Sequence, residues 1–134
     1  MNAILSGQDI ILLGERGQAK SRIIRSLTTL LDEKIPVLAD ATIPENPFAP
    51  VSAEGKKVVA EEGDAAAINW MTSEMRYGEK LATPDITIAD LIGEVDPIKI
   101  AEGRYLCDEE ALHFGLIPNT NRGIIAINEL PDLA

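Results

Sequence analysis

The residues of this chain that are best suited to chemistry lie in two segments far apart in the sequence. The first is GERGQAKS, residues 14–21, where a glycine-bearing stretch ends at Lys20 and Ser21. The second is the pair Asn128 and Glu129, which follows a short apolar run. A lysine and a hydroxyl after a flexible turn suit a polyphosphate with Mg²⁺, and a carboxylate opposite them suits activation of a water molecule.

The first segment has the flanks that a phosphate-binding loop requires. An apolar run predicts a buried strand over residues 9–14, and apolar side chains at the spacing of one face predict a helix over residues 20–32. The turn between them aims backbone N–H groups at a phosphate, and the helix start adds partial positive charge. Lys20 is expected on the terminal phosphates and Ser21 on the metal. The expected binding residues are Gly14, Glu15, Arg16, Gly17, Gln18, Ala19, Lys20 and Ser21.

The loop departs from the phosphate-loop pattern G-x-x-x-x-G-K-[ST] at one position. Ala19 stands where the second glycine is expected, and Gly17 lies two residues earlier. Because alanine has a Cβ, it resists a positive φ and a close approach of phosphate. The alternative interpretation is an ordinary strand–loop–helix unit with a polar surface loop.

The second segment predicts a buried strand over Ile124 to Ile127 that runs into two polar residues. The carboxyl end of a strand is where α/β proteins place their chemistry, so Glu129 is the expected catalytic carboxylate, with Lys20 opposite it. The expected metal-binding set is Ser21, Asn128 and Glu129. Asn128 takes the place of the usual aspartate, so it can accept a hydrogen bond from metal-bound water but carries no charge. The alternative is a strand that simply exits to solvent.

Composition limits the classes of partner. The 134 residues suffice for one domain with a modest core, and the net charge of −10 argues against nucleic acid or membrane as a main partner. A local cationic cluster of Arg16, Lys20, Arg22 and Arg25 still permits an anion pocket. The single cysteine, Cys107, fits a reducing compartment, and with no recognisable signal peptide or membrane span the expected location is cytoplasmic.

The rest of the chain predicts short elements between irregular connections. Four prolines predict an extended, irregular segment over residues 35–53. His113 is expected to be solvated or hydrogen-bonded, with metal ligation by the neighbouring acids at 108–110 as the alternative. The other expected elements are a helix over Ala65 to Tyr77, an edge strand over 81–87, a helix over Ile88 to Ile92 capped by Thr87, a short piece over 97–103, and a helix over Glu109 to Phe114.

Taken together and in this order, these segments resemble the AAA+ ATPases, and more closely the magnesium-chelatase I subunit and its MoxR-like relatives. LLGERGQAKS is similar to that family's phosphate loop and ENPFAP to its extended segment after the first helix. TIADLIGEVDPIKIAEG is similar to the stretch after its second strand, and GLIPNTNRGIIAINEL to its approach to an acidic strand. The likeness extends over most of residues 9–134, and the last block is the most specific.

The resemblance implies an α/β fold, a three-layer αβα P-loop NTPase sandwich of AAA+ type. It also implies that ATP and Mg²⁺ are bound and that ATP is hydrolysed in a homo-oligomeric ring that remodels a protein client. Lys20 and Ser21 would hold phosphates and Mg²⁺, Glu129 would activate water, and residues 104–116 would fall where relatives touch their partner. Residues 1–134 are expected to be the N-terminal part of the ATPase core, truncated after the acidic strand, with weak hydrolysis.

Two further interpretations remain open at this point. The first is a non-hydrolysing, nucleotide-responsive binding module, in which Ala19 and Asn128 mark lost chemistry. The second is an α/β interaction domain that binds no nucleotide.

Overall fold

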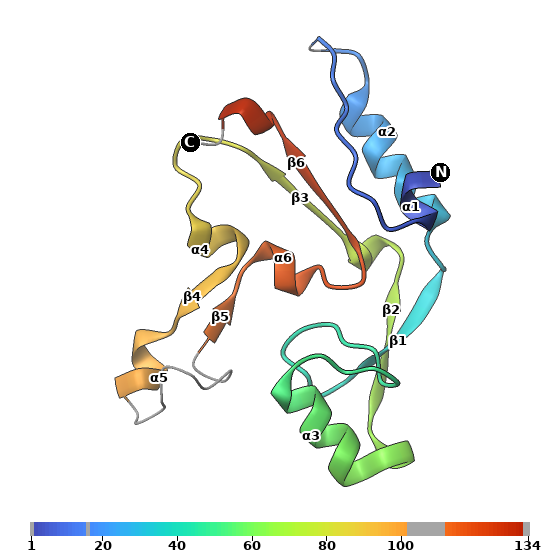
Figure 1. Cartoon of the computed structure of the whole chain (residues 1–134), viewed down its shortest axis with the longest axis vertical. Coiled ribbons are helices and arrows are strands. Elements are labelled where there is room, and N and C mark those ends of the chain that lie inside the picture. The colour runs from blue at the N-terminus through green and yellow to red at the C-terminus, as the bar shows by residue number, and fades with distance from the viewer. Residues whose placement is uncertain (1, 16, 102–111, 133–134) are drawn as a thin grey trace.

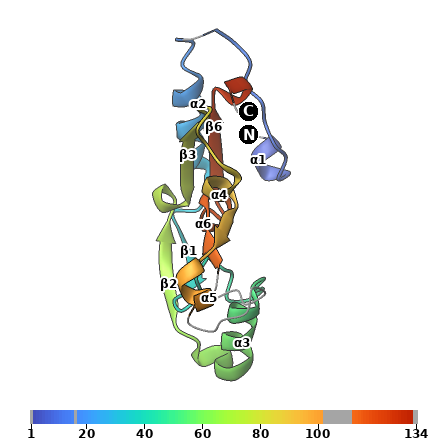
Figure 2. The ribbon, with the colours of Figure 1, turned by 90° about the vertical axis from the view of Figure 1, so that its left-hand side faces the viewer.

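The computed structural model describes residues 2–15, 17–101 and 112–132. Within these residues the chain is a mixed α/β structure in which short helices connect three two-stranded sheets (Figure 1). Figure 2 shows that the elements lie in a long body that is narrow when viewed from its side. An α/β fold, as expected from the sequence, is therefore observed.

The central sheet consists of β3 (Tyr77–Leu81) and β6 (Ile124–Asn128), which pair in parallel. Their register runs from Tyr77 opposite Ile124 to Leu81 opposite Asn128. Both strands therefore end at the same edge, at the top of Figure 1, where β6 leads into a short 3₁₀ turn at Leu130–Asp132. The strand expected over residues 124–127 is confirmed and extends by one residue.

A second sheet pairs β1 (Lys34–Leu38) with β2 (Ile68–Thr72) in antiparallel orientation. The inward side chains Ile35, Val37 and Met71 form a buried apolar cluster. Helix α3 (Ala53–Glu62), followed by a 3₁₀ turn at Gly63–Ala65, lies beside this sheet at the bottom of Figure 1. The Ser52 hydroxyl accepts a hydrogen bond from the backbone N–H of Gly55 and thereby caps the start of α3.

Two expectations for this region are wrong. The proline-rich segment begins with a strand rather than irregular chain, because Pro36 lies within the β1–β2 ladder. The helix expected over residues 65–77 is replaced by β2, a 3₁₀ turn at Glu74–Arg76 and the start of β3. Pairing with β1 buries Met71, whereas Trp70 and Met75 are exposed.

A third sheet pairs β4 (Gly93–Val95) with β5 (Leu112–Phe114) in antiparallel orientation. Its flanking helices are α4 (Ile88–Leu91), α5 (Pro97–Ala101) and α6 (Leu116–Asn119). The expected cap is confirmed: Thr87 and Asp90 form a reciprocal capping box at the start of α4.

Two further expectations for this region are wrong, and other expectations concern residues outside the described ranges. No strand covers residues 82–87, because β3 ends at Leu81. Residues 112–114 form β5 rather than the end of a helix, since they pair with β4. Cys107 and the acids at 108–110 lie outside the described residues, as does most of the segment 104–116 that the resemblance assigns to a partner.

The N-terminal region comprises α1 (Asn2–Leu5), an extended segment over residues 8–14, and α2 (Lys20–Ser26). Helix α2 continues as a 3₁₀ turn, Leu27–Leu30, so the expected helix is largely confirmed. The strand expected over residues 9–14 is wrong, because this segment pairs with no strand in the described part of the chain. Its apolar side chains are left in solvent, with Ile11 72% and Leu13 90% exposed.

Candidate functional site

The loop between the extended segment and α2 curls around the side chain of Lys20. The Lys20 ammonium group donates hydrogen bonds of 2.7 Å to the carbonyl of Gly14 and 2.6 Å to that of Glu15. Gly14 has a φ of 157°, a backbone conformation that residues with a side chain rarely adopt, so glycine is favoured at the start of this loop. A phosphate bound here would replace the two carbonyls as the acceptor for Lys20.

Ala19 adopts the conformation that its position in the phosphate-loop pattern demands of a glycine. Its φ is 57° and its ψ is 20°, in the left-handed region, which costs a non-glycine residue about 1 kcal/mol or more. Gly17 also has a positive φ, of 83°. Ala19 provides no side-chain hydrogen bond to α2, so the first N–H groups of that helix have no capping side chain.

The two chemical segments of the sequence meet at one contact. The Ser21 hydroxyl donates a long hydrogen bond of 3.5 Å to Oδ1 of Asn128, across 107 positions of sequence. Because β6 and the loop before α2 end on the same side of the central sheet, the start of α2 faces the carboxyl end of β6 (Figure 1). Two of the residues predicted to bind the metal, Ser21 and Asn128, are thus neighbours.

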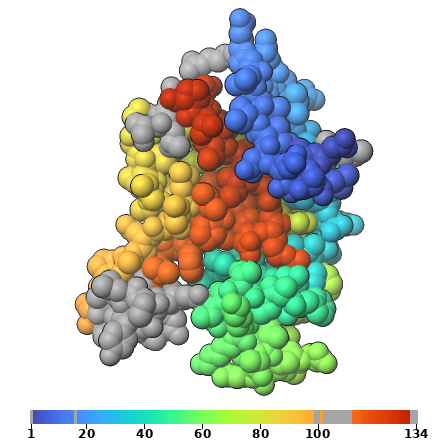
Figure 3. Space-filling model, in the orientation of Figure 1, coloured from blue at the N-terminus to red at the C-terminus, as the bar shows by residue number. Residues whose placement is uncertain are grey.

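A groove of about 1390 Å³ runs between the extended N-terminal segment and β6. Figure 3 shows the N-terminal segment, in blue, lying beside the C-terminal strand, in red. Apolar side chains from both sides line most of the groove. Its polar end gathers five of the predicted site residues: Gly14, Lys20, Ser21, Asn128 and Glu129.

The other predicted site residues lie outside this groove. Glu15, Gly17, Gln18 and Ala19 are exposed on the loop and do not line it, while Arg16 lies outside the described residues. Glu129 follows β6 with a φ of 56°, so the chain turns sharply at the residue predicted to activate water.

Asn128 contacts Glu79, a residue that the sequence did not single out for the site, and Glu79 in turn is held by Arg25 and Tyr77. The Glu79 carboxylate accepts a hydrogen bond of 2.6 Å from Nδ2 of Asn128. It also accepts two hydrogen bonds from Arg25, of 2.8 Å from Nε and 2.9 Å from a terminal nitrogen. The Tyr77 hydroxyl donates to the same carboxylate at 3.2 Å. No local pattern marks Glu79, because only the pairing of β3 with β6 brings it to Asn128.

The surroundings of Glu79 stabilise its charge. Hydrogen bonds from Arg25, and then from Asn128 and Tyr77, hold the pKa of the Glu79 carboxyl below its ordinary value, against the opposing effect of burial. The same hydrogen bond raises the pKa of Arg25, and burial raises the pKa of the Tyr77 hydroxyl. Glu79 is therefore an anion at neutral pH, and it lies one side chain away from the Ser21–Asn128 contact.

The side-chain oxygen atoms at this end of the groove are of the ligand type that suits Mg²⁺. The hydroxyl of Ser21, the amide oxygen of Asn128 and the carboxylate of Glu129 are the hard oxygen ligands that this cation prefers. Across the described ranges, no three His, Cys, Asp or Glu side chains cluster closely enough to hold a metal. Mg²⁺ at this place would consequently share its coordination with phosphate oxygens and water, which is its usual mode in nucleotide sites.

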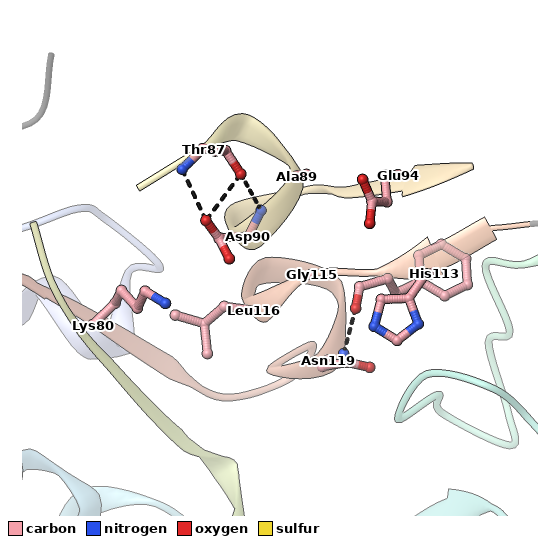
Figure 4. Close-up of a pocket in the computed structure, with 10 residues that line it drawn as sticks. Lys80, Thr87, Ala89, Asp90, Glu94, His113, Gly115, Leu116 and Asn119 are labelled. Atoms are coloured by element: carbon pink, nitrogen blue, oxygen red, sulfur yellow. Dashed lines mark hydrogen bonds between the residues drawn. The ribbon is translucent and has the colours of Figure 1, made fainter. Parts of the chain in front are cut away.

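A second, smaller pocket of about 480 Å³ lies between α4, the β4–β5 sheet and α6 (Figure 4). Lys80, Asp90 and the exposed His113 are among its polar lining residues. Asp90 already accepts hydrogen bonds from the backbone and hydroxyl of Thr87, and Asn119 donates 2.8 Å to the Phe114 carbonyl. None of the predicted site residues lines this pocket.

Comparison of the chain with protein-family models, with curated proteins and with solved structures finds no match. Within the described ranges, every helix is too short or too polar to cross a lipid bilayer.

Proposed function

We propose that this chain binds ATP with Mg²⁺ at the polar end of the groove between the 14–21 loop and β6. In this proposal Lys20 neutralises the terminal phosphates, Ser21 and Asn128 hold the cation through oxygen atoms, and Glu129 faces the attacking water. The fold would be part of a three-layer P-loop sandwich, as the resemblance to AAA+ ATPases implies.

The observation that carries the proposal is the 3.5 Å contact between Ser21 Oγ and Asn128 Oδ1. Two segments chosen from the sequence for phosphate and metal chemistry converge at one point, although one of the flanking strands was predicted wrongly. The Lys20 ammonium group lies within the same loop, and both ends of the contact line one groove.

Each side chain has a separate task in the proposed mechanism. Lys20 would offset charge on the phosphates, and its ammonium group folds back to the carbonyls of the first two loop residues, Gly14 and Glu15. Bound Mg²⁺ would neutralise the charge that develops on the phosphate oxygens. The Glu129 carboxylate would accept a proton from water as that water attacks the terminal phosphorus, while the bond from that phosphorus to the bridging oxygen breaks and ADP leaves.

Ring assembly, a protein client and a cytoplasmic location enter the proposal through the AAA+ resemblance alone. The resemblance covers residues on most elements of the chain, whereas the site itself depends on a few of them. The nucleotide site can therefore be tested without reference to any client.

Isothermal titration calorimetry with ATP tests the proposal, with Mg²⁺ present and with the metal chelated. The wild-type chain should bind ATP more tightly with Mg²⁺, and Lys20→Ala should lose binding in both conditions. Lys57→Ala, an exposed lysine on α3, is the matched control and should bind as wild type does. Equal affinity in the Lys20→Ala and Lys57→Ala variants would contradict the proposal.

A second function is favoured by two specific departures, namely a nucleotide-responsive module without hydrolysis. Ala19 holds a left-handed backbone without the freedom of glycine, and Asn128 brings an amide where a carboxylate would bind Mg²⁺ more strongly. Phosphate release separates the two functions. Turnover that is lost in Glu129→Gln favours the ATPase, and binding without turnover favours the module.

A further inference from the structure

The amide of Asn128 lies between two partners of different hydrogen-bonding character. On one side is the carboxylate of Glu79, 2.6 Å from Nδ2, and on the other is the hydroxyl of Ser21, 3.5 Å from Oδ1. An ionised carboxylate can only accept hydrogen bonds, whereas a hydroxyl can donate or accept. The orientation of the amide is therefore decided by Glu79 and not by Ser21.

Glu79 is itself held in place by groups that use its other lone pairs. Arg25 donates to both carboxylate oxygens in a bidentate pair, and Tyr77 donates to Oε2. The Glu79 side chain is only 22% exposed, so it has little freedom to turn away from Asn128. A charge-assisted hydrogen bond of 2.6 Å to a fixed acceptor leaves the amide of Asn128 one stable orientation.

We infer that Glu79 is a positioning residue of the proposed nucleotide site. Its carboxylate accepts a hydrogen bond from the NH₂ group of Asn128. The Oδ1 atom of Asn128 therefore points toward Ser21, where the cation would be held. Glu79 also places a full negative charge beside the uncharged Asn128, at the strand end where the AAA+ pattern has an aspartate. The inference rests on the proposed function for its ligand, while the orientation of Asn128 stands on the contacts alone.

Removal of the charge on Glu79 is the sharpest test. Glu79→Gln is isosteric and removes the charge that fixes the amide of Asn128. Tyr77→Phe is the matched control, because it removes a hydrogen bond to Glu79 Oε2 but leaves the bond from Asn128 to Oε1.

The measurement uses ATP that carries a fluorophore on its ribose. The readout is the affinity with Mg²⁺ present divided by the affinity with the metal chelated. Glu79→Gln should lower this ratio by about 10- to 100-fold, as expected for a residue that orients a metal ligand. Tyr77→Phe should keep the wild-type ratio. An unchanged ratio in Glu79→Gln would overturn the inference.

The NH₂ resonances of Asn128 in a ¹⁵N-correlated NMR spectrum give a second readout that needs no nucleotide. One amide proton should be shifted downfield by the carboxylate in wild type and in Tyr77→Phe, and should move to the position of a free side-chain amide in Glu79→Gln. A free amide already present in wild type would overturn the inference. A wild-type chain that shows the downfield proton but binds no nucleotide would instead refute only the proposed function.

Discussion

Ser21 on the first turn of α2 and Asn128 at the end of β6 are joined by a 3.5 Å hydrogen bond. The contact joins two ends of the chain that share no secondary-structure element. Lys20 and Glu129, the sequence neighbours of these two residues, line the same groove. The predictions that follow test the packing that supports this arrangement and then the site itself.

Gly55→Ala should destabilise the protein, although alanine favours a helix. A Cβ at residue 55 would lie 2.5 Å from Oε2 of the fully buried Glu45 and 3.2 Å from Cβ of Pro50. Overpacking of this kind costs about 1–3 kcal/mol, which exceeds the gain of about 1 kcal/mol from helix propensity. Urea unfolding measures the difference, with the exposed Lys57→Ala as the control on the same helix. A more stable Gly55→Ala would show that Glu45 can move.

Thr87→Ala should cost about 1 kcal/mol, because it removes the side-chain acceptor that caps α4. The Thr87 hydroxyl accepts from the backbone N–H of Asp90, and the Asp90 carboxylate accepts from the Thr87 backbone. Thr87→Ser keeps the hydroxyl and should retain most of the stability. Equal loss in both variants would mean that the methyl group, and not the cap, supplies the stability.

Asp90 should make the stability of the protein depend on pH. Hydrogen bonds from the Thr87 backbone and hydroxyl lower the pKa of Asp90 below the ordinary value of 3.8. A lowered pKa gives stability that is fully present above pH 3.8 and is lost as the pH falls through the folded-state value. Wild type should therefore lose more stability than Asp90→Asn in urea unfolding between about pH 6 and pH 3. A parallel loss in the two proteins would refute the role of Asp90.

Two leucine-to-alanine substitutions should differ sharply in cost. Leu38 is 3% exposed in β1, so Leu38→Ala should destabilise by about 2–5 kcal/mol. Leu13 is 90% exposed, so Leu13→Ala should change the free energy of unfolding by less than about 0.5 kcal/mol. A large cost at Leu13 would support a buried strand over residues 9–14 in solution.

The sequence predicted the elements whose signals are local. The cap at Thr87, the helix from Lys20 and the apolar strand before Asn128 were all found where expected. These features depend on neighbours within a few residues, so they can be recognised without knowledge of the fold. The pairing of the two chemical segments was also anticipated, because strand ends and helix starts commonly share one edge of an α/β sheet.

The errors arose where distant pairing decides the structure. Residues 68–72 have apolar spacing that suits a helix, but they form a ladder with a strand that contains Pro36. Residues 9–14 have the composition of a buried strand and yet pair with no described strand. Glu79 could not be predicted as a site residue for the same reason, since its partner Asn128 lies 49 positions away.

The most direct test of the nucleotide site is a two-dimensional ¹⁵N NMR titration of the chain with ATP and Mg²⁺. The account predicts that backbone signals of residues 14–21 and of Asn128 and Glu129 shift together with one affinity, and that none of these shifts occurs in Lys20→Ala. Absence of shifts in wild type, or shifts confined to the pocket around Lys80 and His113, would contradict it.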